Sequence, residues 1–284
     1  MALDKRILKD LNELHGTGVI HCAKCLDGLI PAKSGQTSFA TGALPCYFWG
    51  DRKAKTVMVM LNPGEDVANA NANLKRDLSK RSMRDAADIS NYKNWSANYG
   101  HYDRARLDSF DLKQAFFLLN WTGNTGVTLP TGLCAQSNKQ TLLDAKEAVL
   151  TQKLQLELIP YASGSFGNFN SKLLCKVFPF VETLFEEVFS QDREYIIFCS
   201  RKFEKVFKAY NKLHPGSVKF IKEYKCPISN NLRGTCTVIE INYNGKSCKA
   251  IIANTFPSQA LHNAYKVMAA YGDFCYNCLL KHLP

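Results

Sequence analysis

Residues 56–61 form a short, continuously apolar segment, Thr-Val-Met-Val-Met-Leu, that stops at Asn62-Pro63-Gly64. An apolar run of roughly four to eight residues that is closed by turn residues predicts a strand buried on both faces. In an open sheet covered by helices, ligands bind beyond the carboxyl ends of the strands. We therefore expect the chemistry of this protein to lie beside residues 62–64.

The remaining apolar periodicity predicts alternating helices and strands. Strands are expected at residues 115–120, 156–165, 195–199, 235–241 and 247–253, and helices at residues 3–14, 141–156, 171–190, 200–210 and 259–271. Asn244-Gly245, between the last two strands, is a strong hairpin signal. This alternation predicts one domain over residues 1–284, a three-layer α/β/α sandwich around a central, mainly parallel sheet. We expect the N-terminal segment, residues 1–50, to pack on that domain.

The chain of 284 residues carries a net charge of +11, with the hydrophobic content (46%) and charged content (21%) of an ordinary globular protein. A strongly basic chain indicates a polyanionic partner, and we expect double- or single-stranded DNA. A basic protein without such a partner is the alternative. No apolar run is long enough to cross a membrane, and the first residues carry charges where a signal peptide is apolar. We therefore expect a cytoplasmic monomer.

Two common phosphate-binding motifs are excluded. Asn244-Gly245-Lys246-Ser247 ends like a P-loop, but Glu240 occupies the position of its first glycine. Gly16-Thr17-Gly18 lacks the third glycine and the preceding strand of a dinucleotide site. Kinases, GTPases and nicotinamide-dependent enzymes are therefore not supported.

Three segments, each at the end of a predicted strand, follow one another along the chain. They are Met60-Leu61-Asn62-Pro63-Gly64, Phe117-Leu118-Leu119-Asn120 and Phe256-Pro257-Ser258-Gln259-Ala260-Leu261. In this order they resemble the motifs of the uracil-DNA glycosylase superfamily. The resemblance implies that superfamily's fold, with a central, mainly parallel four-stranded sheet. It also implies hydrolysis of the N-glycosidic bond of a flipped uracil or modified pyrimidine in DNA. Such an enzyme would leave an abasic site and would serve repair or defence against modified foreign DNA.

The resemblance also implies a role for each motif residue. Asn62 would position the attacking water, and Glu65 or Asp66 would be an alternative activator of that water; acidic residues at a helix start are the other interpretation. Asn120 would read the base edge, since an amide both donates and accepts, unless it is a satisfied strand-end amide. The other base-binding residues would be Pro63, Gly64, Phe256 and Asn254, and the DNA-binding residues would be Pro257, Ser258, Gln259, Leu261 and His262.

Phe256 departs from the family pattern, in which many members have a histidine that donates to the base oxygen. A phenyl ring cannot donate, so Asn254 or His262 would substitute, or the enzyme would manage with less help to the leaving base. A different, modified base and a loss of activity are further alternatives. Leu261 would be a wedge in the base stack or a core residue of the last helix.

Two Cys-x-x-Cys pairs, Cys22/Cys25 and Cys275/Cys278, have metal-ligand spacing. An iron–sulfur cluster like that of some family members is not expected, because no cysteine lies between Cys46 and Cys134. We expect no cofactor; structural zinc joining the two pairs is the alternative to chance spacing among eleven cysteines. The competing functions are accordingly a non-catalytic DNA-binding protein on the same fold and a metal-stapled basic scaffold.

Overall fold

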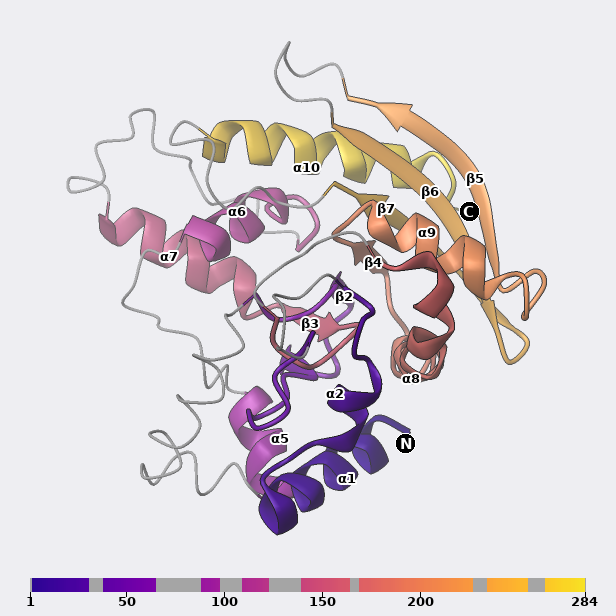
Figure 1. The fold of residues 1–284 in the computed structure, drawn as a ribbon. Helices are drawn as coiled ribbons and strands as arrows, with labels where there is room; N and C mark the ends of the chain where they lie inside the picture. Colours follow the sequence, from indigo (N-terminus) through magenta and orange to yellow (C-terminus); the bar gives the residue numbers. More distant parts are fainter. Residues whose placement is uncertain are drawn as a thin grey trace.

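The structure is a computed structural model that describes residues 2–30, 38–64, 88–97, 109–122, 139–163, 169–226, 234–254 and 264–283. The elements lie around one sheet (Figure 1). In chain order they are α1 (Ala2–Thr17), α2 (His21–Cys25), β1 (Phe48–Gly50), β2 (Thr56–Met60), α5 (Ile89–Ala97), α6 (Ser109–Phe117), α7 (Lys139–Leu150), β3 (Lys153–Glu157), the 3-10 helix η1 (Ser171–Val177), α8 (Phe178–Val188), β4 (Tyr195–Phe198), α9 (Lys202–Tyr210), β5 (Val218–Lys225), β6 (Thr235–Tyr243), β7 (Lys246–Ala253) and α10 (Ala264–Leu280).

The described strands form one seven-stranded mixed sheet in the order β1-β3-β2-β4-β7-β6-β5. The neighbours β3, β2, β4 and β7 are parallel, whereas β1 at one edge and β6 and β5 at the other are antiparallel to their neighbours. The predicted α/β class is confirmed. The predicted number of four strands is wrong, because antiparallel strands extend the sheet at both edges.

The strand β2 lies inside the sheet, and all five of its residues are buried. Its side chains alternate: Val57 and Val59 join one core cluster with residues of α1, α8 and α9, while Met58 and Met60 join a second cluster with residues of α6, α7 and α10. The sheet therefore separates two helix layers (Figure 1). This is why the sequence of β2 is apolar without interruption.

The predicted strand at residues 115–120 is wrong. These residues end helix α6 and form the turn after it. A short apolar run does not distinguish a strand from a buried helix, and here the run packs between α7 and α10. The approach to α10 is close, since a Cβ on Gly272 would lie 2.0 Å from the carbonyl oxygen of Phe117.

The boundary between α7 and β3 also differs from the prediction. The helix stops at Leu150, and the strand starts at Lys153 rather than at residue 156. Lys153, Gln155 and Glu157 alternate with two leucines, so charged and amide side chains face one helix layer. The apolar pattern did not predict this strand, because three of its five residues are polar although the strand is largely buried.

The predicted hairpin is confirmed. Asn244 and Gly245 both have positive φ, 48° and 76°, and they connect β6 to β7. The last helix starts at Ala264 and includes Cys275 and Cys278, whereas residues 259–263 of the predicted helix lie outside the described residues. No helix in the described ranges combines the length and the apolar character needed to span a bilayer.

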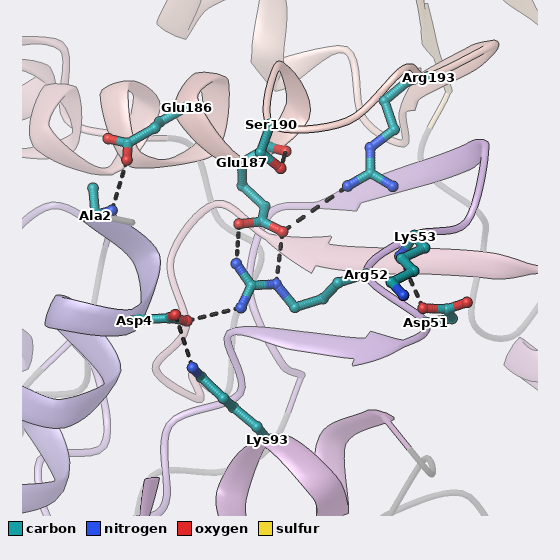
Figure 2. Close-up of polar contacts among 10 residues, drawn as sticks. All are labelled: Ala2, Asp4, Asp51, Arg52, Lys53, Lys93, Glu186, Glu187, Ser190 and Arg193. Atoms are coloured by element: carbon teal, nitrogen blue, oxygen red, sulfur yellow. Dashed lines mark hydrogen bonds and ion pairs between the residues drawn. The ribbon is translucent and has the colours of Figure 1, made fainter. Parts of the chain in front are cut away.

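An ion-pair network fastens the N-terminal helix to the sheet (Figure 2). Arg52, between β1 and β2, forms two hydrogen bonds to the buried carboxylate of Glu187 on α8 and one of 2.7 Å to Asp4 on α1. Lys93 on α5 donates to Asp4 at 2.8 Å, and Arg193 lies 3.9 Å from Glu187. Three helices are thereby tied to one turn of the sheet.

Candidate functional site

The carboxyl ends of the four parallel strands are level with one another. Val59 is paired with Leu156 on β3 and Phe198 on β4, and Phe198 with Ile252 on β7. From β2 the chain moves to β3 on one side, whereas β4 and the strands after it, β5, β6 and β7, lie on the other side of β2. Open α/β sheets bind ligands at such a reversal of direction, beyond the carboxyl ends. We call this region, formed by the segments that follow β2, β3, β4 and β7, the carboxyl edge.

Asn62 is a fixed, buried amide at the carboxyl edge, with a relative exposure of 6%. Its Nδ2 donates to Ser163 Oγ at 2.6 Å, to the Pro63 carbonyl at 3.0 Å and to the Tyr161 carbonyl at 3.5 Å. Within the described part of the chain, Oδ1 has no hydrogen-bond partner. The amide is therefore held by its nitrogen, while its oxygen is available as an acceptor.

The segment after β3 runs beside the one after β2. The amides of Leu158 and Ile159 donate to the carbonyls of Met60 and Leu61, both at 2.9 Å, and Ser163 donates to Pro63 at 3.0 Å. Gly64 and Ser163 complete this parallel pairing. Residues 158–163, which follow β3, are therefore the neighbours of Asn62.

The buried carboxylate of Asp10 is hydrogen-bonded to Tyr161, a residue of this segment. Asp10 on α1 accepts hydrogen bonds of 2.7 Å from the hydroxyl groups of Tyr47 and Tyr161. Burial raises the pKa of Asp10 to about 6, against the opposing effect of the two tyrosines. Tyr161 thus connects the N-terminal helix to the Asn62 amide.

Asn254 lies at the carboxyl end of β7, and its oxygen is bound internally. Oδ1 accepts from the Thr235 amide at 3.3 Å and from the Thr235 hydroxyl at 2.9 Å. The backbone N–H of Asn254 donates to the Tyr271 hydroxyl at 2.7 Å, which donates to the Thr235 carbonyl. Asn254 therefore anchors the end of β7 to β6 and α10.

Asn120 does not join this group. It follows a helix, its side chain is exposed, and its Nδ2 donates to Asp273. The neighbouring Trp121 carbonyl accepts from the hydroxyl of Thr56, the first residue of β2, at 3.4 Å. Asn62 lies six residues further along, on the order of 20 Å away at the rise of an extended chain. The prediction that both amides face one crevice is wrong, because it required residues 115–120 to be a strand.

Several predicted site residues lie outside the described residues. These residues are Glu65, Asp66, Phe256, Pro257, Ser258, Gln259, Leu261 and His262. Pro63 and Gly64 are described and lie beside Asn62 at the carboxyl edge.

The start of α9 brings positive charge to the carboxyl edge. Arg201 and Lys202 follow β4 after a link of two residues, Cys199 and Ser200. Arg201 is partly neutralised, since it lies 3.3 Å from Glu204 and 3.6 Å from Glu223. Burial lowers the pKa of Lys202.

A hollow of about 620 Å³ lies at the other end of the parallel strands, where they begin. It is bordered by the end of α8 and the starts of β4 and β7, including Arg193 and Lys246. None of the predicted site residues that the structure describes lines it.

The two cysteine pairs are on different faces of the sheet. Cys22 packs against the cluster that contains α1, whereas Cys275 and Cys278 are buried in the other cluster beside Cys236. The structure thus does not gather the four cysteines that were the alternative ligands of a structural zinc. Within the described ranges, no three His, Cys, Asp or Glu side chains are arranged to hold a metal ion.

Comparison of the chain with protein-family models, with curated proteins and with solved structures found no match.

Proposed function

We propose that this protein is a DNA glycosylase on a uracil-DNA-glycosylase-like fold. It hydrolyses the N-glycosidic bond of an extruded uracil or modified pyrimidine and leaves an abasic site. The observation that supports this function best is the Asn62 amide: it is buried at the carboxyl edge, held through Nδ2, and followed by Pro63-Gly64.

In this proposal the Asn62 oxygen holds the water that attacks the sugar. An amide is too weak a base to remove a proton, so the rate enhancement comes from orientation and from electrostatic stabilisation of the cationic sugar. The hydrogen bond from Nδ2 to Ser163 orients the amide before substrate binds. Ser163 is therefore a positioning residue in this mechanism.

DNA binding is attributed to the net charge of +11 and to the start of α9. Phosphate contacts of this kind give salt-dependent affinity without sequence preference. Base recognition is attributed to groups at the carboxyl edge and no longer to Asn120.

The test is an incubation of the purified protein with DNA duplexes and single strands that carry uracil or modified pyrimidines, followed by assays for free base and abasic sites. Asn62→Ala should lower the rate at least ~100-fold, as the loss of one group that stabilises a transition state does. Asn120→Ala is the matched control, because it removes an asparagine amide near the amino end of β2, away from the carboxyl edge. The rate of this variant should equal that of wild type. Equal loss in both variants would contradict the proposed site.

The second candidate is a non-catalytic DNA-binding protein on the same fold. It is favoured by Phe256, which cannot supply the hydrogen bond that a histidine donates to the departing base. It predicts salt-dependent DNA binding by the wild type and by Asn62→Ala alike, with no base released from any substrate.

A further inference from the structure

Glu157 is the last residue of β3 and is paired with Met60, the last residue of β2. Its side chain faces the same layer as Met60, Cys199 and Ala253, because Leu156 before it faces the other layer. These four residues form the final row of the parallel strands on that face. Asn62 follows Met60 by two residues, so Glu157 belongs to the carboxyl edge.

Glu157 ends a chain of buried polar side chains. Lys153 Nζ donates to Gln114 Oε1 on α6 and to Gln155 Oε1, both at 2.7 Å, and Gln155 Nε2 donates to Glu157 Oε1 at 2.8 Å. The other oxygen, Oε2, is buried and has no hydrogen-bond partner among the described residues. Since an unpaired buried polar atom is unfavourable, this oxygen calls for a ligand or a water.

The surroundings keep this carboxyl group neutral. Burial raises the pKa of Glu157 to about 8, against the smaller opposing effects of Gln155 and Lys153. The titratable groups that act near it are Lys153 on its own strand and the thiol of Cys199, the residue after β4, with Asp111 of α6 acting on Lys153. Because Oε1 already accepts from Gln155, the proton belongs on Oε2.

We propose that Glu157 is a base-binding residue of the site, whose Oε2–H donates a hydrogen bond to a carbonyl oxygen of the extruded pyrimidine. This inference rests on the proposed glycosylase function and deepens it. When the bond from the sugar to the base breaks, its electron pair leaves with the base, and negative charge develops on that carbonyl oxygen. Glu157 keeps its proton and stabilises this charge, which supplies the donor that Phe256 cannot be.

The experiment compares wild type with Glu157→Ala and Glu157→Gln in single-turnover base release between about pH 6 and about pH 9, a range that spans the pKa of about 8. Glu157→Ala should lose ~10²–10³-fold, the range measured when one such donor is removed. Glu157→Gln retains a donor at every pH, so it should restore most of the rate. The wild-type rate should fall as the pH rises through about 8, and the Glu157→Gln rate should not.

Glu182→Gln is the matched control, because that carboxylate is half-exposed on α8 in the other helix layer, and its rate should equal wild type. Thermal unfolding of each variant separates a folding defect from a loss of base recognition. Base release by Glu157→Ala at the wild-type rate would overturn the role of Glu157 while leaving the proposed function intact.

If the wild type releases no base from any DNA, the proposed function fails, and Glu157 is then judged by binding. Wild type that prefers oligonucleotides with an unpaired pyrimidine over fully paired DNA, with that preference lost in Glu157→Ala, would support base recognition. An equal preference in both proteins, or no preference in wild type, would overturn it.

Discussion

The buried carboxyl group of Glu157 makes the stability of the fold depend on pH in a defined window. Its pKa rises from 4.5 in the unfolded chain to about 8 in the native state. Between these values the native state holds a proton that the unfolded chain has released, so raising the pH favours unfolding. Stability from this group is complete below pH 4.5 and is lost as the pH rises toward about 8.

The magnitude follows from about 1.4 kcal/mol per pH unit while the two states differ by one proton. From about pH 6 to about pH 7.5 the wild type should lose about 2 kcal/mol of unfolding free energy from this group. At the lower limit Asp10, whose pKa is about 6, is already about half ionised in the native state, so most of its linked stability change lies below this range. The upper limit lies below the pKa of Lys153, which is lowered to about 8.

Glu157→Gln removes the titrating group and keeps its shape, so this loss should disappear. The measurement is urea-induced unfolding, followed by circular dichroism, of wild type, Glu157→Gln and the control Glu182→Gln at the two pH values. The control should keep the wild-type loss, because its carboxylate is half-exposed. An equal change in all three proteins would refute the assignment of the pH dependence to Glu157.

Three further substitutions test the supports of the fold by urea-induced unfolding. Arg52→Met should lower the unfolding free energy by about 3–5 kcal/mol, since Glu187 is left charged and buried, and adding Glu187→Met should restore much of it. Asp10→Ala should lower it by about 2–4 kcal/mol, because two buried tyrosine hydroxyls lose their acceptor; a smaller loss than for an exposed aspartate would contradict this. Gly272→Ala should lower it by about 1–3 kcal/mol or more through overpacking of the helix contact, whereas Gly16→Ala, with open space around it, should not destabilise.

Some errors of prediction have a common physical origin. The prediction assigned two segments, residues 115–120 and residues 153–157, to the wrong kind of element. For residues 115–120 the reason is that a short apolar run suits a buried helix as well as a strand. The second run contains Lys153, Gln155 and Glu157, whose side chains are buried or half-buried and are linked by hydrogen bonds to one another and to Gln114. Local patterns do not contain that information, since the partners are created by folding.

The position of Asn62 was decided by the sequence itself: a continuously apolar segment suits a strand covered on both faces, and Pro-Gly ends it where the carboxyl edge begins. Asn244-Gly245 likewise determined its hairpin, because both residues tolerate positive φ. Tertiary structure alone decided that Asn120 lies near the amino end of β2 and that residues 157–163 lie beside Asn62. The reason is that these placements depend on strand order and on which helix layer covers each face, and both are set by long-range packing.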